Sequence, residues 1–199
     1  MKTIALSKRV DIVTAYEERR DALDQRWIFL LKQAGLLAVP VPNCPEWLDS
    51  YLEKHSFDGV LLTGGNSLVR YGGNAPERDA LEARLLDHAL NHDLPVLGVC
   101  RGMQVLLDRF GTLLHPVKGH VAAEQEIEIE GKRSLVNSYH DWGTSSQVVK
   151  GFNVWARADD GIIKAVRHLQ RPLWGIMWHP ERCSPFRSED LLLLRRVFT

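Results

Sequence analysis

The 199-residue chain has no excess of charge of either sign and no long apolar segment. Its 25 lysine and arginine residues balance 25 aspartate and glutamate residues. A nucleic-acid-binding protein normally carries a basic face, and this balance gives no electrostatic reason to expect one. The longest apolar runs, Leu36–Pro42 and Leu94–Val99, are far shorter than the ~20 residues that span a bilayer. We therefore expect a protein that binds neither nucleic acid nor a membrane.

The first residues also lack the pattern of a secretory signal. Lys8 and Arg9 stand where a signal peptide needs its apolar stretch. Together with the short apolar runs, this predicts a cytoplasmic protein.

Cysteine is scarce, with only Cys44, Cys100 and Cys183, and no two of them form a Cys-x-x-Cys pair. An odd number of widely separated cysteines matches neither a disulfide framework nor a zinc site. A free cysteine is most often a small buried hydrophobe, so only its surroundings in the chain can mark one as reactive. We interpret Cys44, beside a proline, as a packing residue and Cys183 as a bystander.

Internal repeats, low-complexity segments and linkers are absent as well. A chain of this length suits one domain, which can bury roughly 70% of its unfolded surface around a single core. We therefore predict one domain over residues 1–199.

What the first half does contain is an alternation of short apolar runs and amphipathic segments, which favours a parallel sheet with helices on both faces. The predicted strands are Thr3–Ser7, Leu36–Val41, Gly59–Leu62 and Pro95–Val99. The predicted helices are Arg20–Ala34, a helix capped by Asn43 that runs to about His55, Pro76–Asn91 and Arg101–Phe110.

After Gly111 the pattern changes to short strands. Residues 124–130 alternate between apolar or amide and acidic side chains, as a half-exposed strand does. Further strands are predicted at Leu135–Asn137, Val154–Arg157, Ile162–Val166 and Leu173–Met177, before a C-terminal helix with Ser188 as its N-cap. The sequence thus predicts an α/β fold with three layers, in which a central, mostly parallel sheet carries a small antiparallel β extension.

The most informative stretch surrounds Cys100. A buried-type strand leads directly into a helix at Arg101, and Gly98 and Gly102 stand two positions on either side of the cysteine. Such a strand-to-helix turn exposes a nucleophile, and the helix N-terminus favours its thiolate form. The N–H of Arg101 can point at a developing oxyanion. Cys100 also falls at the carboxyl end of a strand, where open α/β sheets bind ligands, and is predicted to be a nucleophile.

A thiolate nucleophile needs a base, and the base needs an orienting partner. The last predicted strand delivers His179 to its carboxyl end, and Pro180 fixes the backbone so that Glu181 can turn back toward the imidazole. A lone histidine at a strand end is most often a satisfied structural residue. The pairing with Glu181 and with the turn at Cys100 favours a catalytic role instead.

A pair of glycines, Gly64 and Gly65, follows the third predicted strand after Thr63. Paired glycines let a backbone N–H approach a substrate oxygen closely and would supply a second oxyanion donor. An ordinary turn is the alternative. A phosphate-binding loop would need a following Gly-Lys-Ser/Thr, which is missing.

These three motifs, Gly98–Gln104, Thr63–Gly65 and Trp178–Glu181, together resemble the class I glutamine amidotransferase superfamily, in the family's order and over nearly the whole chain. Within it, Arg78-Asp79, Tyr71-Gly72 and Val136–His140 are similar to the γ-glutamyl hydrolase branch, peptidase family C26. Residues 18–27 are similar to γ-glutamyl-CDP-amidate hydrolases of surface-polysaccharide pathways. The resemblance implies a flavodoxin-like three-layer fold and chemistry without a cofactor or metal.

The resemblance also implies a role for each matching residue. Cys100 would attack the γ-carbonyl of a small γ-glutamyl substrate and form a thioester, while His179 shuttles the proton and Glu181 holds its tautomer. The N–H groups of Gly65 and Arg101 would form the oxyanion hole. The residues implied in binding the glutamyl group are Gly64, Gln104, Ser138, Tyr139 and His140.

Two departures from the family's pattern concern substrate contacts. Met177 replaces a usual glutamine before the Trp-His-Pro-Glu run, and Asp141–Gly143 differ from the common hydrolase pattern. The leaving group is therefore left open.

Three alternatives stay open at this point. The chain could be a glutaminase subunit that supplies ammonia to a separate synthase chain, or a non-catalytic binding module on the same fold. His88 and His92 are four residues apart on a helix and could bind zinc, but no third ligand is obvious and a solvated face is favoured. A homodimer is neither indicated nor excluded.

Overall fold

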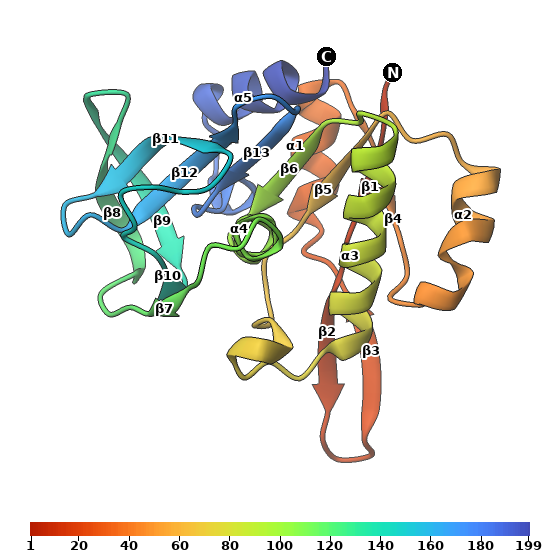
Figure 1. The fold of residues 1–199 in the computed structure, drawn as a ribbon. Helices are drawn as coiled ribbons and strands as arrows, with labels where there is room; N and C mark the ends of the chain where they lie inside the picture. The colour runs from red at the N-terminus through yellow and green to blue at the C-terminus, as the bar shows by residue number, and fades with distance from the viewer.

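A nine-stranded sheet runs through the centre of the computed structural model, which describes all residues 1–199 (Figure 1). Its strand order is β4-β1-β5-β6-β13-β12-β11-β8-β9. The first five strands in that order are parallel: β4 (Leu37–Pro40), β1 (Thr3–Leu6), β5 (Gly59–Leu62), β6 (Val96–Val99) and β13 (Leu173–Ile176). The other four continue the sheet in antiparallel pairing: β12 (Ile163–His168), β11 (Phe152–Ala158), β8 (Val121–Ile129) and β9 (Lys132–Tyr139).

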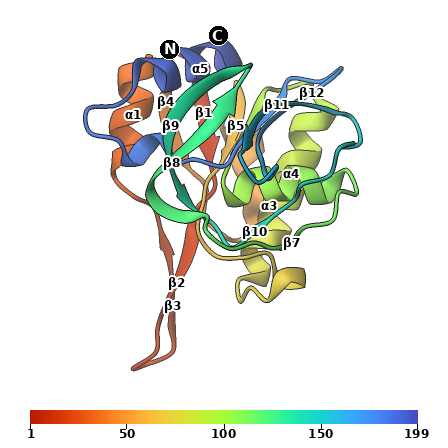
Figure 2. The ribbon, with the colours of Figure 1, turned by 90° about the vertical axis from the view of Figure 1, so that its left-hand side faces the viewer.

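Helices cover both faces of the parallel half of the sheet (Figure 2). On one face lie α1 (Arg26–Ala34) and α5 (Ser188–Phe198), which contact each other. On the other lie α3 (Pro76–Asn91) and α4 (Arg101–Arg109), while the short α2 (Leu48–Lys54) lies beside the β4 edge. The prediction of an α/β fold with a mostly parallel sheet and an antiparallel extension is confirmed.

Alternate side chains of the central strands enter two separate cores. In β5, Leu61 joins the core beneath α1 and α5, whereas Val60 and Leu62 join the core beneath α3 and α4. Because both faces of these strands are covered, they are apolar at every position rather than at every second one.

The first helix begins later than predicted, and the prediction of helix from Arg20 is wrong. Residues before it form a hairpin of β2 (Arg9–Val13) and β3 (Glu18–Ala22), which projects beyond the end of the sheet (Figure 1). Most of its residues are exposed and only Val10 is buried, so it has no buried apolar face of the kind that marks a strand of the core. The amide of Asn66 ties it to the rest of the protein, with hydrogen bonds of 2.9 Å to the N–H and to the carbonyl of Val10.

The predicted N-caps of the second and the last helix are also wrong. Arg187 is the N-cap of α5, and Ser188 is its first helical residue. Asn43 donates its side-chain amide to the Lys8 carbonyl and the Asp21 carboxylate, and so holds the hairpin instead of a helix end. A 3-10 turn, Pro45–Trp47, precedes α2.

Smaller elements complete the structure. A two-residue pairing joins β7 (His115–Pro116) to β10 (Trp142–Gly143), and 3-10 turns also occur at Val69–Tyr71 and Pro180–Arg182. None of the helices is both long enough and apolar enough to cross a membrane.

Candidate active site

Three neighbouring parallel strands end at the same edge of the sheet and bring the three sequence motifs together. In the register of the sheet, Gly98 of β6 lies between Leu62 of β5 and Gly175 of β13. The residues that follow each strand therefore emerge side by side: Thr63–Gly65, Cys100 and His179. This is the edge at which open α/β sheets bind ligands.

Cys100 occupies a sharp turn between β6 and α4. Its φ is +53° and its ψ is −105°, a left-handed conformation that a non-glycine residue rarely adopts. Hydrogen bonds fix this turn on both sides, from Cys100 N–H to the Ile176 carbonyl (2.7 Å) and from Gln104 N–H to the Cys100 carbonyl (3.1 Å). The turn holds the thiol at the start of the helix, and Cys100 as a whole is 6% exposed.

The two glycines around Cys100 are required by close backbone packing. A Cβ on Gly102 would lie 2.1 Å from the Leu62 carbonyl oxygen, and one on Gly98 would lie 2.4 Å from the backbone of Gly102. The backbones of β5, the turn and the start of α4 thus lie so close together that no side chain fits at position 98 or 102.

His179 and Glu181 form a buried pair. His179 Nδ1 lies 2.7 Å from Glu181 Oε1, and the two side chains are 2% and 3% exposed. The short 3-10 turn that begins at Pro180 brings Glu181 back to the imidazole. This arrangement leaves Nε2 as the nitrogen that can exchange a proton with a thiol or a substrate.

Asn137 holds the backbone of His179 from β9. Its amide oxygen accepts a hydrogen bond from His179 N–H (2.7 Å), and its amide nitrogen donates to the His179 carbonyl (2.8 Å). Asn137 falls within the Val136–His140 motif, but the motif alone does not indicate this role.

The charge state of His179 depends on its neighbours. Burial alone would lower its pKa, but interaction with the Cys100 thiolate and with the Glu181 carboxylate raises the pKa of His179 to about 9. The imidazolium form is therefore favoured when the thiol is ionised, which is the condition of a thiolate–imidazolium pair.

Arg78 holds the loop Thr63–Gly65, which follows β5, through hydrogen bonds to its carbonyl groups. This fully buried guanidinium donates to the carbonyls of Thr63 (2.7 Å), Gly64 (3.0 Å) and Gly65. Because the C=O and N–H of one peptide unit point in opposite directions, these bonds turn the N–H of Gly65 away from Arg78. That N–H has no acceptor within the backbone, and the N–H of Arg101, at the start of α4, precedes the helical ladder.

Arg78 belongs to a buried cluster of alternating charges. Its Nε lies 2.9 Å from Glu82, and the Arg101 side chain binds both Glu82 and Asp79. Burial alone would raise the pKa of Glu82, but Arg101 and Arg78 lower it, so the carboxylate stays ionised. The cluster joins α3 to the two loops that supply the N–H groups.

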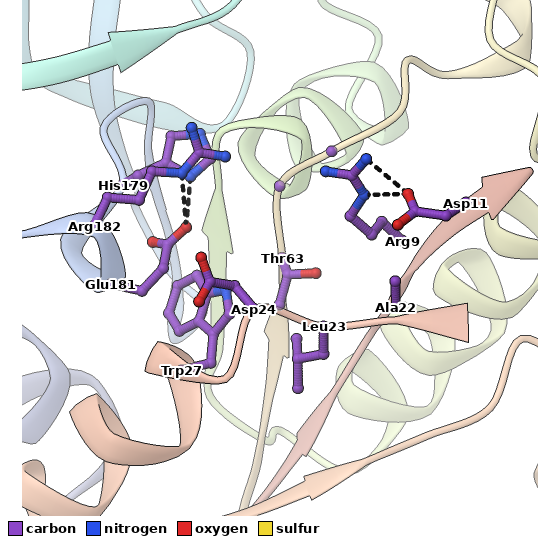
Figure 3. Close-up of a pocket in the computed structure, with 12 residues that line it drawn as sticks. Arg9, Asp11, Ala22, Leu23, Asp24, Trp27, Thr63, His179, Glu181 and Arg182 are labelled. Atoms are coloured by element: carbon purple, nitrogen blue, oxygen red, sulfur yellow. Dashed lines mark hydrogen bonds and ion pairs between the residues drawn. The ribbon is translucent and has the colours of Figure 1, made fainter. Parts of the chain in front are cut away.

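A pocket of about 290 Å³ opens beside the His179–Glu181 pair (Figure 3). Gly64 and Gly65 line one wall, and the β2–β3 hairpin and the segment after it line another. Arg9 and Arg182 enter the pocket from opposite sides. Gly64 also contacts the imidazole so closely that a Cβ there would lie 2.5 Å from His179 Cε1.

Of the residues predicted to bind the glutamyl group, Gly64 lines this pocket, whereas Gln104 and Ser138–His140 do not line it. The Tyr139 carbonyl is 3.8 Å from Cys100 Sγ, and the Tyr139 ring meets the His179 ring edge-on with centroids 5.8 Å apart. The Gln104 amide and His140 Nδ1 both donate to the Trp142 carbonyl, each at 3.0 Å. Ser138 is buried and its hydroxyl donates to the His120 carbonyl. These polar groups are thus bonded within the protein, and the group of this segment that contacts Cys100 is the Tyr139 carbonyl.

Several residues near the site were not predicted as site residues. Some of them could have been noticed in the sequence, because they are charged residues at positions where the pattern calls for apolar ones. Arg78 and Glu82 fall on the apolar stripe of α3 with Leu81 and Leu85, where charged side chains are unexpected. Lys164 interrupts an apolar strand in the same way. Arg9 leaves no such signal, because its place beside the site depends on the hairpin.

The remaining candidates lie elsewhere. All three cysteines are free, and Cys183 accepts a hydrogen bond from Asn137 at 3.7 Å, while burial raises the pKa of its thiol. The rings of His88 and His92 lie with their centroids 4.2 Å apart, and no group of three or more His, Cys, Asp or Glu side chains forms a metal site anywhere in the chain.

Comparison with known proteins agrees with the motifs. The family model of Peptidase C26 matches residues 4–181. The γ-glutamyl-CDP-amidate hydrolase of Campylobacter jejuni is 29% identical over 192 residues, which cover 95% of this chain and 94% of that protein. The γ-glutamyl-γ-aminobutyrate hydrolase of Escherichia coli is 29% identical over 218 residues, covering 88% and 83%. A subunit of the glutamine-hydrolysing GMP synthase of Methanosarcina barkeri is 30% identical over 160 residues, covering 76% and 78%.

A solved structure shows the same fold. A putative GMP synthase subunit from Thermoplasma acidophilum superposes with a TM-score of 0.74 at 18% identity, covering 100% of this chain and 92% of that one. The resemblance to class I glutamine amidotransferases that the three motifs indicated is confirmed.

Proposed function

We propose, because the chain belongs to the peptidase C26 family, that it hydrolyses the γ-glutamyl amide bond of a small substrate through a thioester on Cys100. Its relatives are γ-glutamyl amide hydrolases and glutamine-hydrolysing synthase subunits, so the class of bond is common to all of them. The single observation that carries the proposal is the convergence of Cys100, the His179–Glu181 pair and the Gly65 N–H at one sheet edge.

The first half of the reaction would form the thioester. The Cys100 thiolate attacks the γ-carbonyl carbon, and the oxygen that becomes negative receives hydrogen bonds from the N–H groups of Gly65 and Arg101. The His179 imidazolium then gives its Nε2 proton to the leaving nitrogen as the C–N bond breaks. Glu181 keeps the other ring nitrogen protonated and stabilises the imidazolium.

The second half would release glutamate. Neutral His179 accepts a proton from water, the resulting hydroxide attacks the thioester carbon, and the C–S bond breaks to regenerate the thiolate. Every proton and electron pair in these steps moves between water, the substrate and the side chains of the site. A γ-glutamyl-CDP-amidate-type substrate is the specific candidate, supported by the relative that matches 95% of the chain.

The test is glutamate release by the purified chain from a panel of glutamine, γ-glutamyl peptides, γ-glutamyl amines and γ-glutamyl phosphoramidates. Cys100→Ala is expected to fold and to release no glutamate, while Cys183→Ala, which removes the thiol that follows the Pro180–Arg182 turn, keeps activity. Residual turnover by Cys100→Ala would contradict the nucleophile assignment. A chain that is inert alone, and that hydrolyses glutamine only after a synthase chain is added, would support the ammonia-donating alternative instead.

Other expectations from the sequence remain proposals. They are a single domain over residues 1–199, a cytoplasmic location, and the roles of Gly64, Gln104 and Ser138–His140 in holding the glutamyl group.

A further inference from the structure

Lys164 is a buried charged side chain that the proposed reaction does not use. It lies in β12 and is 1% exposed. Its Nζ donates to Ser138 Oγ at 2.9 Å and to His140 Nε2 at 2.7 Å, and both acceptors are uncharged. The carboxylate nearest along this network, Asp160, binds His120 and not the lysine. A buried ammonium is rarely left without a carboxylate, because its desolvation is then compensated only by neutral groups.

The two acceptors of Lys164 flank the residue that contacts the nucleophile. Ser138 and His140 stand on either side of Tyr139, whose carbonyl is 3.8 Å from Cys100 Sγ. The backbone of Lys164 is also linked to the backbone of Cys100, through two adjacent residues at the end of β13. Its carbonyl accepts from Met177 N–H (2.8 Å), and the carbonyl of the preceding Ile176 accepts from Cys100 N–H (2.7 Å).

The titratable groups around the Lys164 ammonium are His120, His140, Asp160 and Cys100. The His120 ring stacks on His140 with centroids 5.0 Å apart, and His120 Nε2 lies 2.9 Å from Asp160 Oδ2. His140 is uncharged, because burial, Lys164 and His120 lower its pKa to about 3. The charges that act on Lys164 are those of Asp160 and Cys100, and His179 acts on its acceptor His140.

Lys164 remains protonated at neutral pH although it is buried. Burial lowers the pKa of Lys164 to about 8, against the opposing effects of Asp160 and of Cys100. Asp160 is exposed to solvent, so its charge is screened. Of the two anionic groups that act on Lys164, the Cys100 thiolate is therefore the buried one.

We propose that Lys164 is a positioning residue of the reaction: its buried ammonium fixes the Ser138–His140 segment beside the nucleophile and stabilises the Cys100 thiolate electrostatically. The proposal rests on Cys100 being the nucleophile of the proposed function. A purely structural lysine would hold the segment without changing the ionisation of the thiol.

The experiment compares Lys164→Gln and Lys164→Met with the wild type. Glutamine can still form hydrogen bonds with Ser138 and His140 but has no charge, whereas methionine removes both. Lys132→Gln, an exposed lysine on β9, is the matched control. The readout is the rate of Cys100 alkylation by iodoacetamide from about pH 5 to about pH 9.5, followed on the Cys100 peptide so that Cys44 and Cys183 do not contribute.

For both Lys164 variants we expect the midpoint of the alkylation profile to move to higher pH by about one unit, with alkylation at pH 7 slowed about tenfold. The kcat/KM for glutamate release should fall by a similar or larger factor, while Lys132→Gln behaves as the wild type. Circular dichroism reports folding, and where the methionine variant does not fold the glutamine variant carries the test.

A wild-type alkylation midpoint in a folded Lys164→Gln variant would overturn the proposal, whatever happens to kcat/KM. The failure of the proposed function looks different. In that case the wild type releases no glutamate from any γ-glutamyl substrate, although the alkylation midpoint of Cys100 still moves when Lys164 loses its charge.

Discussion

The imidazole of His179 rests against Gly64, with Cε1 so close that no side chain fits between them. A Cβ at position 64 would lie 2.5 Å from that carbon atom. The loop proposed to supply one oxyanion donor therefore also sets the position of the proposed general base. Activity should depend on both residues as one unit, and effects of substitutions in such a unit are not additive.

Gly64→Ala is expected to displace the imidazole and to lower kcat by about 100-fold, because a misplacement of about 1 Å can have an effect of this size. The backbone at Gly64 does not have a positive φ, so alanine itself is not strained there. Steady-state kinetics and thermal unfolding check this together. A normal kcat in a folded Gly64→Ala variant would contradict the prediction, because it would show that the ring can be displaced without loss of activity.

Glu181→Gln is expected to lower kcat by about 10³-fold or more, because the amide no longer favours the tautomer and the charge that catalysis needs. The pH profile should change as well. Since Glu181 contributes to raising the pKa of His179 to about 9, its loss lowers that pKa and moves the alkaline limit of activity to lower pH. An unchanged alkaline limit would mean that another group controls it.

Arg78→Lys keeps the charge but cannot reach three carbonyls at once. We expect kcat to fall about 100-fold, with KM little changed, because the variant loosens the loop that carries the Gly65 N–H. The free energy of unfolding should fall by about 2 kcal/mol, since buried hydrogen bonds to Glu82 and the loop are lost. Arg84→Lys, on the same helix and paired with the exposed Asp49, is the control and should change stability by about 0.5 kcal/mol or less.

His140 should make the protein less stable in acid. Its pKa is about 3 in the folded protein and about 6.5 in an unfolded chain, so the unfolded state binds the extra proton between these values. Stability from this group is complete above about pH 6.5 and is lost as the pH falls toward 3, by about 2 kcal/mol between pH 7 and pH 5. Urea unfolding of His140→Gln at both pH values should show a correspondingly smaller loss. An equal loss in both proteins would mean that His140 is protonated in the folded state.

The part of the site that could be predicted from sequence is the part carried by local patterns. Cys100 between two glycines and His179 two residues before Glu181 each lie within a few residues of a strand end, and the parallel register of β5, β6 and β13 brings them together. Arg78 and Lys164 contact the site from distant elements. Their partners, the loop carbonyls and the Ser138–His140 segment, are defined only by the tertiary structure.

The β2–β3 hairpin shows why the predicted first helix begins too early. Its second strand is largely polar and exposed, and in its first strand only Val10 is buried, so its strands are set by pairing with each other and by the Asn66 amide and have no buried apolar face. Without the hairpin, Arg9 cannot be predicted to line the pocket either, because it lies in the first strand of the hairpin.

The pocket beside His179 is where a leaving group should lie, because in the proposed reaction the imidazolium gives its proton to the leaving nitrogen. Arg9 and Arg182 face this pocket from opposite sides, and the Arg9 side chain lies directly against Gly65. Each guanidinium already has a carboxylate nearby, Asp11 at 2.7 Å from Arg9 and Glu181 at 3.6 Å from Arg182. Both guanidinium groups retain unused N–H donors, which suit a phosphate or carboxylate.

Arg9→Ala is therefore expected to lower kcat/KM about tenfold for γ-glutamyl substrates with an anionic leaving group, the loss of one charge-assisted hydrogen bond. A neutral leaving group, such as p-nitroaniline, should be affected about twofold or less. Comparing a γ-glutamyl phosphoramidate with γ-glutamyl-γ-aminobutyrate separates phosphate from carboxylate recognition. Arg20→Ala, in the same hairpin but paired with Glu18 and outside the pocket, is the control. Equal losses for charged and neutral leaving groups would show that Arg9 supports the loop at Gly65 and does not select the substrate.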